Sequence, residues 1–439
     1  MATRFTPEIV VDRFQQTRCG RPIGCEDGSM RRHWAGGTDR LLAGRRFTCL
    51  FSDLDVPPAS VIADAMAELA AAGSHTRLAL TPRRDRRIWS ADRQCPIAVH
   101  ELPDSVAQDA PSGVLEYVRR LPGPRRPLTA HTSPRRLVLD LDHGLGDGRF
   151  AVDLTSALFA HCRGDSTPWV SQGDTPLALP QALFHVFARH PVQVAAVWRQ
   201  VARIRSEPAV ESGPTVPWSP SYAVTLTRVD AEAERAVNQW CRAHGERPGS
   251  AAVWLHLVRQ ALSTAGIAMT PRAIVAFDCR RYQPDGQTAN ANFMIGLDIP
   301  ATLEEPISVL AARLLGLMVS GAPLAGMAVV SAKAMLGLAP DVAAPSVRRI
   351  GAPGVVMYSD MGLLTGLEVP WRAGGVRLAT GLLDPAGPNA ITVLNTRADD
   401  TRTLAISFHD NVFDRQVVER AAAALAEPMR ILGEPTPSQ

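Results

Sequence analysis

Residues 137–150 read LVLDLDHGLGDGRF, and this stretch decides the interpretation of the chain. Apolar residues alternate over 136–142, which predicts a half-buried strand, and the glycines of 143–148 predict a tight turn. The spacing of apolar residues over 149–162 predicts a helix. The sequence therefore places His143, Asp147 and Gly148, in an H-x-x-x-D-G pattern, between a strand and a helix. Because an isolated short motif is weak evidence, the rest of the chain has to support it.

Length and composition describe a folded globular chain. With 439 residues the protein exceeds the usual size of one core, so we expect two large domains or one domain with a substantial extension. Hydrophobic residues make up 46% and charged residues 20%, which excludes a disordered or collagen-like chain. The net charge of +3 gives no indication of a nucleic-acid partner. Lys333 is the only lysine, and its SAKAML setting matches no phosphate-loop, Schiff-base or kinase lysine.

The cysteines and the N-terminal residues give expectations about disulfides, metal binding and cellular location. The cysteines are odd in number and lack a C-x-x-C pair, so they indicate neither a disulfide framework nor a thiolate zinc site. They are Cys19, Cys25, Cys49, Cys95, Cys162, Cys241 and Cys279, and we expect reduced, mostly buried thiols. The start of the chain lacks a signal-peptide apolar run, and no stretch approaches ~18 apolar residues. We therefore expect a cytoplasmic location and no membrane span.

The order of expected elements predicts an α/β protein with two related halves. A strand over 47–56 is followed by a helix over 59–72 and a strand over 75–80, and an apolar helical block over 179–204 joins the halves. We divide the chain into an N-terminal lobe, 1–210, and a C-terminal lobe, 211–439. Further strands are expected over 222–227, 273–279, 292–299, 353–359, 376–383, 390–396 and 402–408, and helices over 230–244, 249–265, 306–319 and 414–431.

Two nucleotide-type interpretations of the glycine-rich turn compete. A dinucleotide loop, G-x-G-x-x-G, fails at Arg149, and Asp147 would put a carboxylate where the pyrophosphate must lie. The run from Asp140 to Gly148 also resembles the D-x-x-x-G-x-G-x-G loop of S-adenosylmethionine methyltransferases. That fold needs another parallel strand ending in an acidic residue, but the following segment, 164–180, is rich in proline and glycine. The methyltransferase remains the rival enzyme class.

Several runs in both halves resemble the chloramphenicol-acetyltransferase-like superfamily, which includes free-standing acyltransferases, polyketide-associated acyltransferases and condensation domains of peptide synthetases. The superfamily's general-base motif is H-x-x-x-D-G, here within LDLDHGLGDGRFAVDLTSALF (139–159). The other runs follow the family's order: VIADAMAELAAAGSHTRLAL (61–80), VTLTRVDAEAERAVNQWCRAHG (224–245), VAFDCRRYQ (275–283), NANFMIGLDIP (290–300), VVMYSDMG (355–362) and ITVLNTRADDTRTLAISFHDNVFD (391–414). The resemblance thus covers nearly the whole chain.

The resemblance implies a fold and an activity. Two chloramphenicol-acetyltransferase-like α/β sandwich lobes would form a V-shaped pseudo-dimer with a central channel. The activity would be transfer of an acyl group from a thioester to a hydroxyl or amine, in natural-product or lipid biosynthesis. His143 would be the general base that takes the proton from the acceptor, because imidazole titrates near neutral pH. The donor would be acyl-coenzyme A or the acyl-phosphopantetheine of a carrier protein, so an acyl or peptidyl carrier protein is a candidate partner and a small molecule the acceptor. No permanently bound cofactor and no metal is implied.

The resemblance also assigns supporting residues. Asp147 would turn away from the substrate and pair with Arg280, which braces the loop, and Gly148 would let the loop pass close to neighbouring backbone. Gly148, through its N–H, Ser359 and Asn292 are the candidate oxyanion or channel residues. Many condensation domains have a second histidine where this chain has Asp142, to which we assign no role. This departure favours an acyltransferase or an atypical condensation enzyme, and leaves a catalytically degenerate carrier-protein docking module as the non-enzyme alternative.

Overall fold

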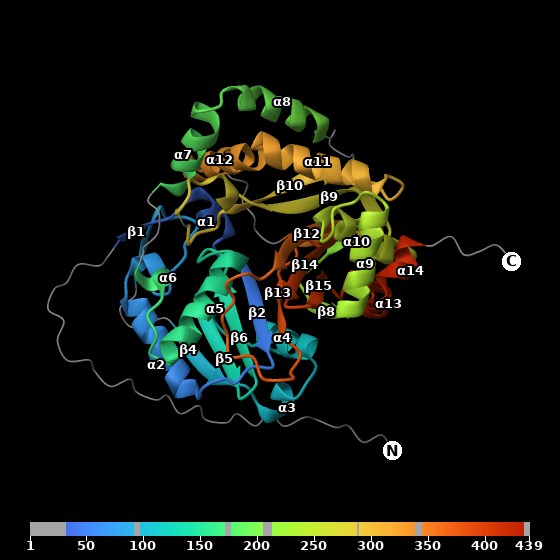
Figure 1. Cartoon of the computed structure of the whole chain (residues 1–439). Coiled ribbons are helices and arrows are strands. Elements are labelled where there is room, and N and C mark those ends of the chain that lie inside the picture. Colours follow the sequence, from blue (N-terminus) through green and yellow to red (C-terminus); the bar gives the residue numbers. More distant parts are fainter. Residues whose placement is uncertain are drawn as a thin grey trace, which may run out of the picture.

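The protein is described by a computed structural model that covers residues 32–91, 97–171, 177–204, 213–287, 289–338 and 345–433 (Figure 1). The first half contains β1 (Arg32–Trp34), α1 (Gly37–Leu42), β2 (Arg46–Ser52), α2 (Ala59–Ala71), η1 (Ser74–Thr76), β3 (Ile88–Ser90), β4 (Ala98–Glu101), α3 (Asp104–Ala107), α4 (Pro111–Arg120), β5 (Leu128–Ser133), β6 (Arg136–Asp142), α5 (Gly148–Cys162) and α6 (Pro168–Ser171). The connector contains α7 (Ala178–Leu183), the π-helical turn η2 (Phe184–Ala188) and α8 (Val192–Ile204).

The second half repeats the mixture of strands and helices. It contains β7 (Thr215–Pro217), β8 (Tyr222–Val229), α9 (Ala231–Ala243), α10 (Ala251–Thr264), β9 (Met269–Asp278), η3 (Arg280–Tyr282), β10 (Met294–Pro300), α11 (Ile307–Ser320), α12 (Ala322–Met335), β11 (Val347–Arg349), β12 (Gly354–Leu363), β13 (Leu378–Leu383), β14 (Ala390–Ala398), β15 (Thr401–His409), α13 (Arg415–Ala426) and α14 (Pro428–Leu432). The predicted α/β fold class is confirmed by this mixed architecture with several sheets.

A five-stranded sheet, in the order β13-β2-β6-β5-β4, forms the first half. Its strands bury both faces: Phe51 and Leu139 pack into one core, with α2 and α5, whereas Leu50 and Val138 pack into another, with α4. Strand β13 comes from the second half of the chain and pairs antiparallel with β2. The second half of the chain, after residue 211, thus supplies one edge strand of the first sheet.

The strand that precedes the glycine-rich turn is antiparallel to both of its neighbours. β6 pairs antiparallel with β2 and with β5. Dinucleotide-type and methyltransferase folds place their glycine-rich loop at the carboxyl edge of a parallel sheet. The topology around β6 therefore does not fit either nucleotide-type interpretation of residues 137–150.

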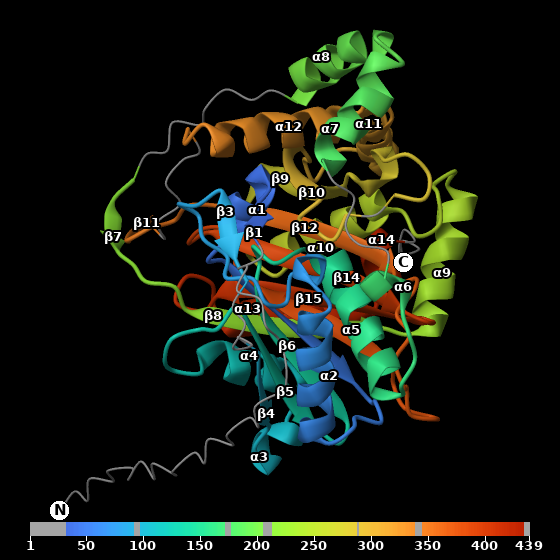
Figure 2. The same ribbon diagram turned by 90° about the vertical axis from the view of Figure 1, so that its left-hand side faces the viewer.

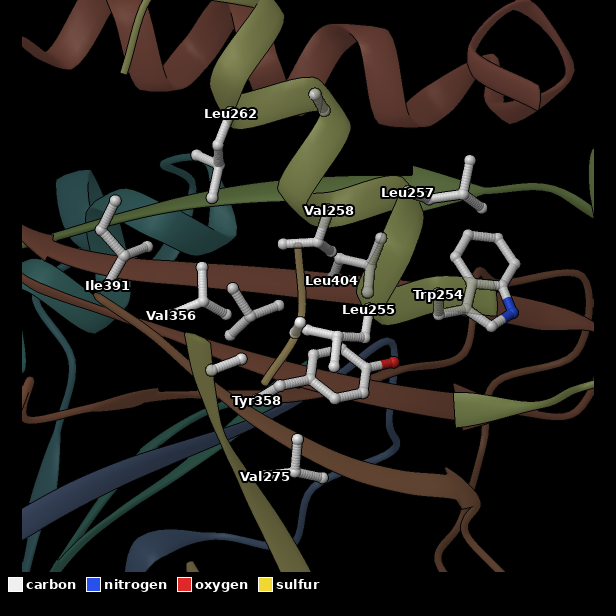
Figure 3. Close-up of a cluster of buried hydrophobic side chains, with 14 of the residues drawn as sticks. Trp254, Leu255, Leu257, Val258, Leu262, Val275, Val356, Tyr358, Ile391 and Leu404 are labelled. Carbon is white, nitrogen blue, oxygen red and sulfur yellow. The ribbon is translucent and has the colours of Figure 1, made fainter. Parts of the chain in front are cut away.

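A mixed six-stranded sheet, in the order β10-β9-β12-β14-β15-β8, forms the second half. The helix α10 covers this sheet and contributes Trp254, Leu255 and Val258 to a buried apolar core with strand residues such as Val356 and Leu404 (Figure 3). Alternate residues along the strands face this core, as a pleated sheet requires. The core holds β9, β12 and β14 in place, and their other face borders the site described below.

The predicted strand over 75–80 is wrong. Ser74–Thr76 forms a short 3-10 turn, and Arg77 takes a left-handed backbone conformation with φ of 64°. An extended strand cannot continue through that conformation, and only Leu80 makes an isolated bridge, to Ala91. Arg77 turns its guanidinium inward to an ion pair with Asp39, which accounts for the interruption.

Other expected elements occur close to their predicted bounds. β6 spans Arg136–Asp142 as predicted, and α9 starts after the N-cap Asp230, whose side chain accepts a hydrogen bond from the Ala233 N–H. The sequence patterns did not predict β4, β5, α4 or α12. Cys49, Cys162, Cys241 and Cys279 are free thiols, whereas Cys19, Cys25 and Cys95 lie outside the described residues.

In the described parts of the chain, no single helix is long and apolar enough to cross a bilayer. Only α11 and α12 together, bent by 63° at their junction, have the length and composition for it.

We expect Leu404→Ala to destabilise the protein by about 2–5 kcal/mol, because it leaves a cavity in the core under α10. Urea unfolding measures the effect. The matched control is Leu315→Ala on the exposed side of α11, expected to change the free energy of unfolding by less than about 0.5 kcal/mol. Equal losses in the two variants would contradict this assignment of the core.

Candidate active site

The H-x-x-x-D-G turn is held by its own backbone and by the start of α5. Asp147 is the N-cap of α5, and its Oδ1 accepts hydrogen bonds from the N–H groups of Arg149 (3.1 Å) and Phe150 (3.3 Å). A side chain at Gly146 would come within 2.4 Å of the Phe150 ring, so this position needs glycine. These contacts hold the turn between β6 and α5 in a compact conformation.

His143 has one ring nitrogen fixed by the turn. Its Nδ1 lies 3.1 Å from the carbonyl oxygen of Gly146, and its ring packs against Phe47 with centroids 4.9 Å apart. Because a carbonyl oxygen only accepts hydrogen bonds, Nδ1 carries the proton and Nε2 carries the lone pair. Burial lowers the pKa of His143 below its ordinary 6.5, so the imidazole is neutral at neutral pH. This is the tautomer and charge state of a general base.

Asp147 and Arg280 join the two halves of the chain. Arg280 Nη1 donates to Asp147 Oδ2 over 2.9 Å and Nη2 donates to Oδ1 over 3.0 Å, and the Phe293 N–H also donates to Oδ2. Burial alone would raise the pKa of Asp147, but the charge of Arg280 and these donors outweigh it and hold the pKa below its ordinary value. The structure thus brings together the aspartate and the arginine that the sequence analysis paired.

A second brace holds the backbone on the other side of His143. Asn292 Nδ2 donates to the carbonyl oxygen of His143 (2.7 Å) and to Asp39 Oδ1 (2.9 Å). Arg77 Nη2 contacts Asp39 Oδ2 at 2.8 Å and donates to the carbonyl oxygen of Gly144 at 3.1 Å. Asp39 and Arg77 are almost fully buried. The sequence analysis missed both residues, because no motif spacing links positions 39, 77 and 292.

Asn292 is therefore placed differently from the sequence expectation of an oxyanion or channel residue. Both hydrogens of its amide group are used in the contacts with Asp39 and His143, and it does not line the cavity described below. An amide with no free hydrogen cannot also donate to an oxyanion. Asn292 therefore holds the backbone of the loop that carries His143.

Asp142 has a structural role that the sequence analysis did not assign. Its carboxylate accepts hydrogen bonds from the N–H of Gly44, at 3.0 and 3.1 Å, and from the N–H of Gly144, at 2.8 Å. Burial raises the pKa of Asp142 to about 6. Asp142 therefore ties the turn to the segment before β2.

A cavity of about 390 Å³ lies between the two main sheets, and His143 is on its wall. Asp147, Gly148, Arg280 and Ser359 also line it. Most other lining side chains are apolar: Phe47, Phe51, Met294, Met357, Met361, Leu363, Leu364, Leu383 and Leu394 are among them. A mostly apolar cavity with a few polar groups at one point is typical of a small-molecule site. His143 is thus open to a ligand space and not enclosed in packed interior.

The opposite wall contributes Ser359 and Asp360 from β12. Burial raises the pKa of Asp360, and its carboxylate accepts hydrogen bonds from Tyr358 Oη (3.2 Å) and the Gly362 N–H (2.8 Å). Within the described residues, no group of three or more His, Cys, Asp or Glu side chains could hold a metal ion. The neutral imidazole of His143, on the wall of the cavity, is able to accept a proton from a bound ligand.

No protein-family model and no curated protein sequence matches the chain. Solved structures do match over nearly its full length. A trichothecene 15-O-acetyltransferase from Fusarium sporotrichioides is 14% identical with a TM-score of 0.60, covering 93% of this chain and 96% of its own. The condensation domain of the Monacolin K polyketide synthase MokA is 11% identical with a TM-score of 0.58, covering 92% of this chain and 98% of its own.

A third match is TRI101 of Fusarium sporotrichioides in complex with coenzyme A and T-2, 13% identical with a TM-score of 0.55, covering 90% of this chain and 97% of its own. The chain has the chloramphenicol-acetyltransferase-like fold. It also matches the nonribosomal peptide synthetase FmoA3, at 16% identity and a TM-score of 0.56, but spans only 43% of that protein's length. At these identities the matches establish the chloramphenicol-acetyltransferase-like fold, and the chemistry has to be argued from the site.

We expect Arg280→Gln to destabilise the protein by about 3–5 kcal/mol at pH 7, because it leaves the buried carboxylate of Asp147 without its ion-pair partner. Urea unfolding at several pH values measures this loss. The pKa of Asp147 is depressed in the folded wild type, so the pair stabilises above about pH 4 and the stabilisation is lost as the pH falls below that. The difference between the two proteins should therefore shrink in acid.

The control for this variant is Arg281→Gln, which removes the exposed neighbouring guanidinium. We expect its free energy of unfolding to stay within about 0.5 kcal/mol of the wild type. If Arg280→Gln unfolds like the control at every pH, Arg280 is not a brace of the loop.

Proposed function

We propose that the protein is an acyltransferase of natural-product biosynthesis that transfers an acyl group from a thioester to a hydroxyl or amine, with His143 as general base. The observation that carries the proposal is the neutral imidazole of His143, with Nδ1 held by Gly146 and the ring on the wall of the cavity. Matches to an acetyltransferase and a condensation domain over more than nine-tenths of the chain support the reaction class.

The proposed step is one proton transfer coupled to acyl transfer. Nε2 of His143 takes the proton from the acceptor hydroxyl or amine as the acceptor attacks the thioester carbonyl carbon. The tetrahedral intermediate collapses as the carbon–sulfur bond breaks, and the new carbon–oxygen or carbon–nitrogen bond remains. The leaving thiolate recovers the proton from the imidazolium. The products are the ester or amide and the free thiol, and His143 returns to its neutral form.

The oxyanion of the intermediate needs a hydrogen-bond donor close to His143. The N–H of Gly148 is the first of α5 and is not one of the two N–H groups that Asp147 caps. Gly148 and Ser359 both line the cavity. They remain our proposed oxyanion donors, with Asp147 and Arg280 as positioning residues.

The donor is proposed to be acyl-coenzyme A or an acyl group on the phosphopantetheine of a carrier protein. TRI101 was solved in complex with coenzyme A, which supports a coenzyme A thioester as the donor. FmoA3 is a nonribosomal peptide synthetase, which supports a carrier-protein thioester as the other candidate donor. In this proposal the lobes 1–210 and 211–439 form the V-shaped pair, with β13 supplied across the seam, and the cavity is part of the channel. The acceptor is a small molecule, and the cytoplasmic location belongs to the same proposal.

We expect His143→Ala to lower the rate of acyl transfer by about 10²–10⁴-fold while the protein remains folded, because the acceptor loses its general base. A panel of acyl-coenzyme A and acyl-carrier-protein donors, read out by intact mass and small-molecule mass spectrometry, measures product. The control is His244→Ala at the exposed end of α9, which should keep full activity. Equal product from wild type and His143→Ala would remove His143 from the mechanism, and no wild-type product with any donor would favour the docking-module alternative.

The pH profile of kcat/KM gives an independent test. The neutral imidazole is the active form, so the rate should fall as the pH falls through the pKa of His143, which burial lowers below 6.5. We therefore expect the acid limb of the wild-type profile to have its midpoint below pH 6.5. A midpoint at or above 6.5 would contradict the buried, neutral base.

A further inference from the structure

The connector between the halves forms a ridge, residues 178–204, at an outer end of the molecule. It consists of α7, η2 and α8, and α8 packs on α11 and α12. Both views show α7 and α8 at the edge of the molecule opposite α3 (Figures 1 and 2). This ridge does not line the cavity that contains His143.

The ridge presents apolar side chains to solvent. Trp198 is 73% exposed and Val192 is 76% exposed, and Val194 and Val201 are also exposed. Val194, Trp198 and Val201 follow one another at intervals of four and three residues, so they form one stripe along α8. Phe184, 64% exposed, extends the apolar surface onto η2.

The inner side of α8 packs on the core of the second half through Val197 and Ile204. Gln193 and Gln200 are partly buried, and the Gln200 amide lies close enough to α11 that a Cβ at Gly316 would approach it to 2.9 Å. A surface helix of a globular protein normally buries its apolar stripe and exposes its polar residues. On α8 the protein-facing side already contains the apolar residues that pack on the core, so the valine–tryptophan stripe is a second apolar surface that faces outward. This second stripe indicates an external apolar environment.

The charged side chains of the ridge itself all have one sign. Arg189, Arg199 and Arg203 are exposed, and Arg199 and Arg203 are one helical turn apart. The ridge contains no aspartate or glutamate. Exposed tryptophan and valine together with arginines, without acidic residues, are the features of a helix that lies in the interface of a bilayer with anionic headgroups.

We propose that the ridge docks the protein on an anionic phospholipid surface, with the Trp198 stripe in the headgroup region and the arginines on lipid phosphates. The helix lies parallel to the bilayer, because its inner side stays packed on α11 and α12. The charge complementarity favours a lipid surface over a second copy of the chain, since two such ridges would bring arginines of like sign together. This proposal does not rest on the acyltransferase proposal.

Vesicle co-sedimentation of the full chain tests the proposal. We expect the wild type to bind vesicles of equal parts phosphatidylcholine and phosphatidylglycerol, to bind phosphatidylcholine alone weakly, and to be released by high salt. Combining Val194→Ser with Trp198→Ser should weaken binding at least roughly tenfold, because the apolar stripe is lost. Combining Arg199→Ser with Arg203→Ser should weaken it by roughly fivefold for each arginine.

Matched controls lie elsewhere on the surface. Trp34→Ser removes another exposed tryptophan, and Arg83→Ser with Arg86→Ser removes two exposed arginines of a different loop. Both controls should bind as the wild type does. Absence of wild-type binding to the anionic vesicles, or equal binding by wild type and ridge variants, would overturn the proposal. So would light scattering that shows a wild-type dimer converted to a monomer by Trp198→Ser, since a second copy would then cover the ridge.

Discussion

The carboxylate of Asp147 is the contact on which the site depends. It caps α5, accepts two hydrogen bonds from Arg280 and one from the Phe293 N–H, and so joins the first sheet's turn to the ends of β9 and β10. A buried carboxylate is costly unless its charge is compensated. The carboxylate is therefore stable only when the two halves of the chain are packed together. The same packing places His143 on the wall of the cavity between the sheets.

The loop around His143 is braced from two sides. Asn292 and Arg77, joined through Asp39, hold the carbonyl groups of residues 143 and 144, while Asp142 holds the N–H groups of Gly44 and Gly144. These contacts leave the imidazole itself with only Gly146 as a hydrogen-bond partner on Nδ1. In the proposed reaction, an imidazole that is already fixed before the acceptor binds needs little reorganisation.

The comparison of sequence and structure separates local from long-range information. β6, the turn and α5 were predictable because alternation, glycines and helical spacing act within about twenty residues. The strand expected over 75–80 does not form, because Arg77 takes a left-handed backbone conformation and forms a buried ion pair with Asp39. The pattern of apolar residues around position 77 carries no information about that distant partner. The apolar stripe of α8 was recognisable as helical, but its outward orientation depends on which side packs against α11.

The sequence by itself determined the local elements around the H-x-x-x-D-G turn, the candidate base His143 and, through the family resemblance, the partner Arg280 for Asp147. Only the tertiary structure decided that Asn292 holds the loop instead of facing a ligand, that Asp39 and Arg77 belong to the site, and that β13 completes the first sheet. The physical reason is that hydrogen bonds and ion pairs between residues more than thirty positions apart follow from how the sheets pack, and no short-range periodicity encodes that packing.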